Sequence, residues 1–452
     1  MPFELTKEYV LKIQEAIEKE DSVTLKAKLE DLYPADISEI LYELDEGQSK
    51  YVIHLLDKEV GGEIISNMDE TLRKDLFKLL SSAEISEFID YIDSDDAADI
   101  LNEQPIRVRE EVIALMKDRQ KARYIIDLLH YDEDCAGGLM AKELVKANVN
   151  WTIQQCIEEI RRQAEKVEKV MSVYVVDDAG ILLGRVSLKR LILSRSEKHI
   201  ADIYDEDVIS VETYRPAEEV ADIMQRYDLE SIPVVNVQGK LLGRITIDDI
   251  VDVITEQADL DRQAMSGISE EVEEDDSVWK LSRARLPWLG IGMVGSLVAA
   301  RFIGIFEEDL LAKISALALF IPIIGSTGGN VGIQSSSFMI QILTDKPALM
   351  IGFGPRLLKI FLVALLNGTI MSSIVLGVTI FVLGQQAKLA VVVAVSLLSV
   401  VLLATFMGTI TPIVLSRYGI NPSVASGPFI TTANDLIGYG VYFLTAHLLY
   451  NL

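Results

Sequence analysis

The sequence predicts a multidomain chain with an all-α superhelical N-terminal domain, a tandem pair of α/β domains and an α-helical domain of five membrane spans. Three observations predict this fold class. A spacing of 24 residues recurs in the first third of the chain. A second repeat follows it with an offset of 59 residues, and long apolar segments then dominate up to the last residue.

Charge separates a soluble part from a membrane part. The chain has 452 residues, half of them hydrophobic, and a net charge of -27. The residues up to Arg283 include 34 basic and 64 acidic ones, whereas 8 basic and 5 acidic residues follow. An acidic soluble half therefore precedes a membrane half. Because acidity repels phosphates and no basic stripe is present, we expect no nucleic-acid partner.

The cysteines and the first residues favour a cytosolic soluble half. Cys135 and Cys156 are the only cysteines, and neither has a CxxC spacing, so no disulfide framework or thiolate zinc site is expected. Residues 1–12 are charged and lack the apolar core of a signal peptide. We expect the first half to stay where it is synthesised.

Residues 1–132 are expected to form the superhelical domain, because apolar residues recur at intervals of three and four residues and because Pro and Gly are scarce. Within this region an acidic residue followed by an apolar one recurs every 24 positions. The members are Glu39-Ile40, Glu63-Ile64, Glu87-Phe88 and Glu111-Val112. A stacked two-helix unit of 24 residues explains this pattern.

Residues 133–199 and 200–256 are expected to be two copies of one α/β domain. Residues 173–187 match residues 232–246 at an offset of 59, and each copy shows a strand, a glycine turn, a second strand and a helix start. The pattern resembles a tandem pair of cystathionine-β-synthase (CBS) domains. The resemblance implies a regulatory module that binds nucleotides or ions at shared clefts.

The nucleotide signature of CBS domains is a Ser or Thr followed three residues later by Asp at a helix start. The second copy has Thr246 and Asp249 at these positions, whereas the first has Ser187 and Arg190. At most one cleft is therefore complete, and ATP is the ligand that we would expect there. The alternative is that Thr246 is a plain helix N-cap.

Residues 257–282 are expected to form an acidic connector helix and linker. The acidic run around it extends from Asp252 to Asp276. A solvated linker would explain this composition. Its position directly before the membrane part also allows a functional role.

Residues 283–452 are expected to form the transmembrane domain. Five apolar spans, each long enough for a hydrocarbon core of roughly 30 Å, lie at 286–306, 311–343, 357–383, 389–416 and 424–450. Lys and Arg near the span ends are more numerous on one side: Arg283, Arg285, Lys346, Arg356, Lys359 and Arg417 against Arg301, Lys313 and Lys388. This bias places the acidic half in the cytosol and the C-terminus outside.

The second span contains Pro322, four glycines that include Gly328 and Gly329, and the polar residues Asn330 and Gln334. Because proline and glycine weaken a helix, we expect unwound backbone here whose carbonyl oxygens line a pathway. The alternative is close helix packing through small residues.

The fifth span contains Asp435, the only carboxylate deep in any span, with Asn434 beside it and Thr431 and Thr432 one turn before. Buried charges in membranes usually face a cavity. A carboxylate with hydroxyl and carbonyl oxygens suits a hard cation such as Mg²⁺ or Ca²⁺. The alternative is a structural Asp that bonds Asn330 or a hydroxyl.

These features together resemble the MgtE family of bacterial magnesium channels. The resemblance rests on the run Pro322 to Gln334, on Asn434-Asp435, on the junction Ala136 to Met140 and on the order of the domains. It implies a homodimer in a lipid membrane whose pore is lined by the second and fifth spans. Asp435 from each subunit would hold a hydrated Mg²⁺, which agrees with the reluctance of this ion to lose water.

The resemblance also implies a gate, in which cytosolic Mg²⁺ bridges acidic surfaces of the soluble domains and the connector. The matching positions are Glu63, Asp95, Asp99, Glu218, Asp228, Asp249, Asp252 and Asp261. Gln257 and Leu260 stand where the family connector commonly carries carboxylates. Either Glu256 and Asp259 substitute for them, or the gate responds at a different Mg²⁺ level. For each of these acids, a solvated surface position is the alternative.

The sequence thus predicts a Mg²⁺ channel of the cell membrane that imports Mg²⁺, with Co²⁺ and Mn²⁺ as further candidate cargoes, and that performs no enzymatic reaction. A proton- or sodium-coupled carrier on the same fold is the alternative. A membrane hydrolase is disfavoured because His447 is the only histidine in a span and has no partner at HExxH spacing.

Overall fold

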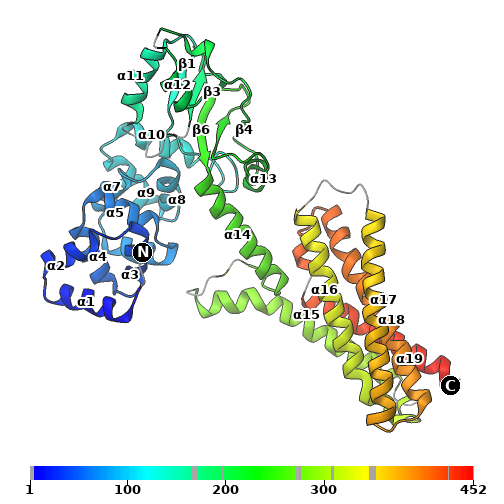
Figure 1. The fold of residues 1–452 in the computed structure, drawn as a ribbon. Coiled ribbons are helices and arrows are strands. Elements are labelled where there is room, and N and C mark those ends of the chain that lie inside the picture. The colour runs from blue at the N-terminus through cyan, green and yellow to red at the C-terminus, as the bar shows by residue number, and fades with distance from the viewer. Residues whose placement is uncertain are drawn as a thin grey trace. The chain divides into compact units, whose positions relative to one another are not determined.

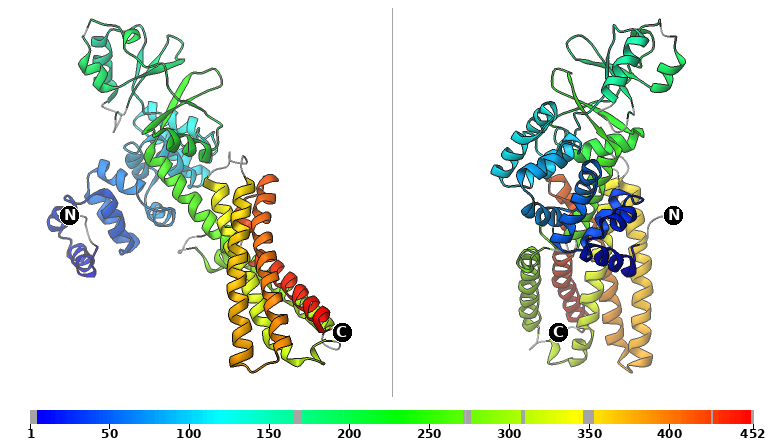
Figure 2. Two further views of the ribbon diagram at one scale, coloured as in Figure 1. Left: turned by 45° about the vertical axis from the view of Figure 1, so that its right-hand side comes forward. Right: turned by 90° about the vertical axis from the view of Figure 1, so that its left-hand side faces the viewer.

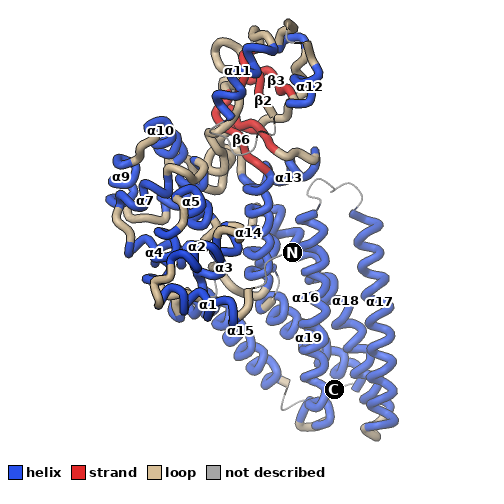
Figure 3. The backbone as a smooth tube through the Cα atoms, turned by 60° about the vertical axis from the view of Figure 1, so that its left-hand side comes forward, coloured by secondary structure: helices blue, strands red, loops and turns tan. Residues whose placement is uncertain are grey.

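The computed structural model describes residues 5–164, 170, 172–195, 197–270, 272, 276–306, 310–345, 353–425 and 427–450. It divides into two compact units, Met1–Thr255 and Glu256–Leu452. In Figure 3 the strands are confined to the first unit, whereas the described part of the second is helical. Lys346 and residues 271 and 273–275 of the predicted connector lie outside the described residues.

The first unit begins with a superhelix of short helices, drawn in blue and cyan in Figure 1. Helices α3, α5, α7 and α9 begin at Pro34, Lys58, Ser82 and Ile106, so the predicted 24-residue unit is confirmed. The helices are α1 Lys7–Glu18, α2 Ser22–Leu29, α3 Pro34–Tyr42, α4 Glu46–Leu55, α5 Lys58–Ser66, α6 Glu70–Leu79, α7 Ser82–Ile89, α8 Ser94–Asn102, α9 Ile106–Leu115 and α10 Arg119–Leu128.

The repeat has a physical cause in its apolar positions and helix caps. The apolar member of each repeated pair, such as Ile64 or Phe88, is completely buried in the domain core. Asp45 and Asp69 are the N-caps of α4 and α6, and each accepts a hydrogen bond from a backbone N–H in the first turn. The equivalent Asp93 caps α8 without such a bond.

The tandem pair follows as two three-stranded sheets with the same topology. In each sheet the first two strands are parallel and the last two antiparallel, and a bulge occurs at the same position of both copies. The elements are β1 Lys146–Asn148, α11 Ile153–Ala164, β2 Val173–Val176, β3 Leu182–Val186 and α12 Leu188–Leu193, then β4 Val211–Glu212, α13 Ala217–Tyr227, β5 Ser231–Val235 and β6 Leu241–Thr246.

The two copies bond to each other at their glycine turns. The Leu182 N–H donates to the Gly239 carbonyl and the Leu241 N–H donates to the Gly180 carbonyl, each at 3.0 Å. Gly180 and Gly239 have φ of 83° and 77°, a conformation that favours glycine. The residue pairs are therefore related by the predicted offset of 59.

Helix α14, Ile247–Met265, is continuous across the expected boundary between the second CBS domain and the connector. The division between the two compact units, after Thr255, also falls within this helix. The connector helix is therefore the second half of α14. The described residues that follow lead to α15, Val278–Ile305.

The second unit is a bundle of long helices. Helix α18 packs against α16, α17 and α19, and α19 also packs against α15 and α16. Figures 1 and 2 show α16, α17 and α18 side by side. The remaining bounds are η3 Ser315–Phe320, α16 Ile321–Asp345, α17 Phe353–Gly377, η4 Val378–Val382, α18 Ala387–Arg417, η5 Pro422–Ala425 and α19 Pro428–Tyr450.

Four described helical segments are both long and apolar enough to span a membrane: Val278–Ile305, Ser315–Leu343, Gly354–Val382 and Ala387–Arg417. Helix α19 has 23 residues but is not among them. Its polar residues, which include Asn434, Asp435 and His447, lower its mean hydropathy. The predicted count of five spans therefore stays a prediction.

The expectation of unwound backbone in the second span is wrong. Helix α16 is continuous from Ile321 to Asp345, through all four glycines. Pro322 lies in the first turn, where a missing N–H breaks no intrahelical hydrogen bond. The irregular backbone lies upstream, in the 3₁₀ helix η3.

Candidate functional site

The carboxylate of Asp435 lies on α19 where this helix passes α16. A Cβ added to Gly329 of α16 would lie 3.8 Å from Asp435 Oδ1 and 3.0 Å from the Thr431 methyl group. Asp435 is half-buried and, among the described residues, accepts no hydrogen bond. The structure therefore brings Asp435, Thr431 and Gly329 together, as the pathway interpretation requires. It does not show the structural alternative, in which Asp435 bonds Asn330 or a hydroxyl.

Other predicted pathway residues pack helices together. Asn434 is 2% exposed and lies against Gly332 of α16. Thr432 lies against Gly295 of α15, where an added Cβ would come within 1.9 Å of the Thr432 methyl group. Gly328 lies against Val400 of α18. For Gly328 this is the packing role that the sequence offered as an alternative for the second span, whereas the packing of Asn434 and Thr432 was not predicted.

Asn330 and Gln334 belong to an exposed polar stripe on α16. Ser326, Asn330, Gln334 and Gln341 are all exposed in the single chain and recur at intervals of four and seven along the helix. Polar side chains within a membrane usually face protein or water rather than lipid. The stripe therefore marks the face of α16 that a pathway or a second subunit would cover. Sequence reasoning missed Ser326 and Gln341 as members.

Sequence reasoning also missed Tyr439, which lies one turn after Asp435 on α19. Its hydroxyl would be 2.4 Å from a Cβ at Gly325. Several glycines of the bundle are each contacted by a polar side chain of α19, and the contact between Tyr439 and Gly325 is one example. The i, i+4 spacing of Asp435 and Tyr439 was the only signal for this contact in the sequence.

A second site is an acidic cluster in the first unit, where α8 meets the start of α14. Asp95 is 8% exposed, and its Oδ1 atom has no hydrogen-bond partner among the described residues. Burial and the neighbouring carboxylates of Asp249 and Asp96 raise the pKa of Asp95 well above its ordinary value. Burial also raises the pKa of Asp249 to about 6, although hydrogen bonds from Thr246 oppose this. Burial and like charges therefore outweigh the nearby cations Lys121 and Arg244, which act on Asp93 at the start of α8 in the opposite direction.

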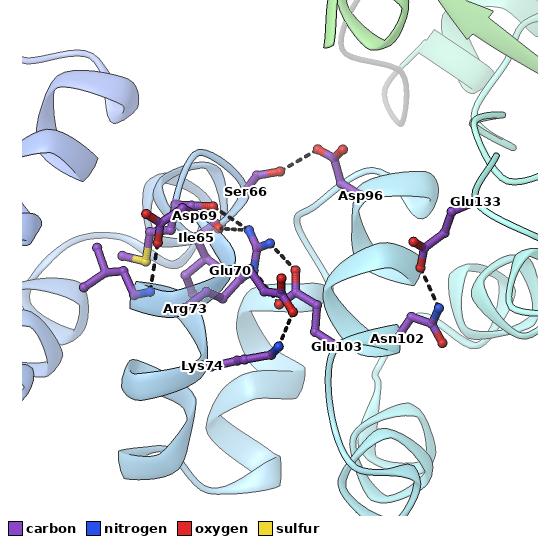
Figure 4. Close-up of polar contacts among 12 residues, drawn as sticks. Ile65, Ser66, Asp69, Glu70, Arg73, Lys74, Asp96, Asn102, Glu103 and Glu133 are labelled. Atoms are coloured by element: carbon purple, nitrogen blue, oxygen red, sulfur yellow. Dashed lines mark hydrogen bonds and ion pairs between the residues drawn. The ribbon is translucent and has the colours of Figure 1, made fainter. Parts of the chain in front are cut away.

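The acid-bearing helix α8 is fixed from three directions, as Figure 4 shows. Ser66 Oγ donates to the Asp96 carboxylate at 2.5 Å. Arg73 donates to the carbonyl of Met68 at 2.7 Å and forms an ion pair with Glu103, the C-cap of α8. Asn102 Nδ2 donates to the Glu133 carboxylate at 2.6 Å. These contacts hold the carboxylates of α8 in place.

Two further acids belong to the same region. Asp99 keeps one side open to solvent, but the surrounding protein and the carboxylates of Glu133 and Asp96 raise its pKa to about 7. Burial and Asp96 also raise the pKa of Asp252. Both Asp99 and Asp252 were predicted regulatory positions, and the structure places each near Asp96.

The remaining predicted regulatory acids lie elsewhere. Glu63 is exposed on α5, and Glu218 and Asp228 stand at opposite ends of the 11-residue helix α13. Asp259 pairs with Arg262 within α14 at 2.9 Å, whereas Glu256 is exposed on the same helix. In the described part of the chain, no three His, Cys, Asp or Glu side chains form a group that could hold a metal ion. A cation here would therefore need water ligands beside one or two carboxylates, a coordination that Mg²⁺ accepts.

A cavity of about 200 Å³ lies between the two CBS copies. Its polar lining includes Tyr174, Arg185, Asp207, Tyr227 and Ser231. The hydroxyl groups of Tyr174 and Ser231, one from each copy, are 3.1 Å apart. Arg185 could bind a phosphate through its guanidinium group.

Thr246 and Asp249 do not line this cavity. The Thr246 N–H and hydroxyl group both donate to Asp249 Oδ2 at 2.9 Å. Asp249 therefore reaches back to the Thr246 backbone N–H at the start of α14, which is one half of a capping box.

The superhelix, the tandem pair and the long apolar helices define a multidomain membrane protein, and comparisons with known proteins show its family. Residues 321–445 match the MgtE family of divalent cation transporters, residues 32–134 the MgtE intracellular N domain, and residues 136–197 and 200–256 the CBS domain. The magnesium transporter MgtE of Thermus thermophilus is 31% identical over 97% of both chains. That of Enterococcus faecalis is 32% identical over 84% of this chain and 89% of its own.

Two solved structures resemble the cytosolic part. One is the soluble part of a magnesium transporter, with a TM-score of 0.51, 28% identity, and coverage of 56% of this chain and 99% of its own. The other is the cytosolic domain of the Mg²⁺ channel MgtE in complex with ATP, with a TM-score of 0.51, 31% identity, and coverage of 54% and 99%. The chain belongs to the MgtE family and is a membrane protein of a transporter class.

Proposed function

We propose that this protein is a Mg²⁺ channel that lets Mg²⁺ enter the cytosol and closes when cytosolic Mg²⁺ binds its acidic surfaces. The observation that carries the proposal is the half-buried carboxylate of Asp435 against the glycine backbone of α16 at Gly329. A carboxylate at this depth is costly in a membrane unless it faces a polar path. Mg²⁺ keeps most of its water ligands, so one carboxylate from each of two subunits suffices as a direct or water-mediated contact.

The polar stripe of α16 supports a homodimer. Asn330 and Gln334 are exposed in the single chain, and lipid would leave their amide groups without hydrogen bonds. A symmetric pair of chains that brings two such stripes together would enclose a polar path between them. In this proposal the acidic half lies in the cytosol, which is the compartment that Mg²⁺ enters, and the C-terminus lies outside.

The acidic cluster supports closure by Mg²⁺. Asp95 comes from the superhelix and Asp249 from the second CBS domain, so a cation between them would join two domains. Without a cation, the like charges weaken this junction. Mg²⁺ would thus stabilise the compact arrangement of the first unit when its cytosolic concentration is high.

The cavity at Tyr174, Arg185 and Ser231 supports nucleotide binding between the CBS copies. The homologous cytosolic domain solved with ATP favours ATP as the ligand. This cavity, rather than the pair Thr246 and Asp249, is the site that we propose.

The test is Mg²⁺ entry into proteoliposomes that contain an indicator, for the parental chain and the Asp435→Asn variant. We expect the variant to lose most of the flux. The control is Ser399→Ala, because this α18 side chain is partly exposed and its hydroxyl group bonds, among the described residues, only the Val395 carbonyl of its own helix. Flux that persists in Asp435→Asn would refute the pathway, and flux that follows a proton or sodium gradient would identify a coupled carrier.

A further inference from the structure

The carboxylate of Asp261, on the second half of α14, bonds the connection between α18 and α19. Its Oδ1 atom accepts hydrogen bonds from Asn421 Nδ2 at 3.2 Å and from Ser423 Oγ at 2.9 Å. Both donors are neutral. Asp261 is thus tied to the segment that leads directly into the helix that bears Asp435.

The donors are oriented by their own turn. Asn421 Oδ1 accepts from the Ser423 N–H at 2.8 Å, so its Nδ2 group is the part that faces Asp261. Ser423 is 1% exposed, and its buried hydroxyl group finds its acceptor in Asp261. An unpaired hydroxyl in this position would cost free energy, so the carboxylate completes a prearranged site.

The backbone of the connection is also fitted to the end of α14. Gly427 has φ of 61°, and a Cβ there would lie 2.9 Å from the Met265 carbonyl oxygen. A Cβ at Gly267 would lie 3.1 Å from the Pro428 ring, which begins α19. Ser336 of α16 donates to the Ala425 carbonyl at 2.8 Å. The connection is therefore held between α14 and α16.

We propose that Asn421 and Ser423 are positioning residues that lock the end of α14 to the start of α19, and that Asp261 acts there as a hydrogen-bond acceptor rather than as a ligand of the regulatory cation. The inference rests on the proposed function for its link to channel closure. It assigns Asp261 a different role from Asp95 and Asp249, which face each other as like charges. Because Asp261 Oδ1 already accepts two hydrogen bonds, its contact with this connection needs no bound cation.

The deciding variant is Asn421→Asp in the full chain. It keeps the acceptor for the Ser423 N–H but places a second carboxylate against Asp261. The rescue is the exchanged pair, Asp261→Asn with Asn421→Asp, in which the new amide donates to the new carboxylate and accepts from Ser423. The control is Asp259→Asn, which removes a nearby charge of α14 that pairs only with Arg262 among the described residues.

Two measurements are made on each variant. Backbone hydrogen exchange of residues 418–428 is measured in divalent-free buffer, and the cytosolic Mg²⁺ concentration that halves the flux is measured in proteoliposomes. For Asn421→Asp we expect exchange to be faster by about fivefold, which corresponds to about 1 kcal/mol for one hydrogen bond. We expect the half-closing concentration to rise by a similar factor, because the lock joins α14 to the pathway helix. The exchanged pair should restore both values, and Asp259→Asn should leave the hydrogen exchange unchanged.

Three outcomes would overturn the lock: parental exchange rates in Asn421→Asp, no rescue by the exchanged pair, or the same rise in hydrogen exchange from Asp259→Asn. If the exchanged pair recovers hydrogen exchange but not Mg²⁺ closure, Asp261 is a metal ligand and the assignment of its role is wrong. If the flux through the parental chain does not depend on Asp435, the proposed function is refuted but the lock is not, because hydrogen exchange tests the contact independently of flux.

Discussion

The side-chain amide group of Asn434 on α19 lies directly against the backbone of Gly332 on α16, a contact that is possible only because position 332 has no side chain. A Cβ at position 332 would come within 1.8 Å of Asn434 Nδ2. On α18, a Cβ at Gly408 would lie 2.4 Å from the Gly332 carbonyl oxygen. The two glycines therefore let three helices approach at one level, next to the turn that carries Asp435.

We expect Gly332→Ala to destabilise the membrane unit. The added methyl group must displace Asn434, and overpacking of this kind costs about 1–3 kcal/mol. The melting temperature in detergent and the Mg²⁺ flux should both fall. Gly377→Ala is the control, because a Cβ there meets nothing within 4 Å. Equal melting temperatures for the two variants would contradict the close contact.

Arg73 offers a test of the superhelix. Arg73→Met leaves two backbone carbonyl groups and the Glu103 carboxylate without their donor, so we expect a loss of about 3 kcal/mol. Lys74→Met is the matched control. It removes only an exposed i, i+4 pair with Glu70, which contributes about 0.5 kcal/mol or less. Urea unfolding measures both, and similar losses would show that Arg73 is not a structural tie.

The acidic cluster predicts a pH dependence of stability. The pKa values of Asp93 and Asp249 are about 6 and that of Asp99 is about 7, all raised by burial in the folded state. Their stabilising contribution is therefore complete below about pH 4, near the unfolded value. It is lost as the pH rises through 6 to 7. In divalent-free buffer we expect the melting temperature of the full chain to fall between pH 5 and 8.

Removal of a titrating acid should weaken this dependence. Asp99→Asn should flatten the pH profile, and saturating Mg²⁺ should also flatten it by stabilising the ionised cluster. Asp31→Asn, an exposed acid of the same domain, serves as the control. A melting temperature that rises from pH 5 to 8 in the parental chain would contradict the role of the cluster.

The cavity between the CBS copies predicts where ATP binds. Arg185→Met should weaken ATP binding at least tenfold, because a charged hydrogen bond to phosphate contributes about 1.5–3 kcal/mol. Asp249→Asn should leave the affinity unchanged, since Asp249 bonds Thr246 and does not line the cavity. Calorimetric titration of both variants measures this difference. The reverse order of effects would place the nucleotide at Asp249.

The repeats could be predicted from the sequence because each repeated unit buries its own residues in the same way. Ile64 and Phe88 are 24 residues apart because each fills the core of its helix pair. The two glycine turns are 59 residues apart, and glycine recurs in them because each turn requires positive φ. Asp435 could be singled out as a candidate by a related argument. One carboxylate in an apolar span is a local signal that needs no partner to be recognised.

Contacts between distant residues could not be predicted in this way. The glycines of α16 are compatible with unwound backbone and with close packing, and only the positions of Asn434, Thr431 and Tyr439 show that packing prevails. Arg73 has the sequence context of an ordinary surface charge, yet it is almost completely buried. Asp261 was predicted as a cation ligand by resemblance. Its hydrogen bond to Asn421 could not be predicted, because the two residues are about 160 positions apart in the chain.

The reciprocal hydrogen bonds between Gly180 and Leu241 and between Gly239 and Leu182 indicate how the tandem pair could have arisen. Each bond is the image of the other under exchange of the copies, as in an isologous interface. A single copy could therefore pair with a twin through the same contact. The copies keep this symmetric contact although Arg190 of the first stands where the second has Asp249.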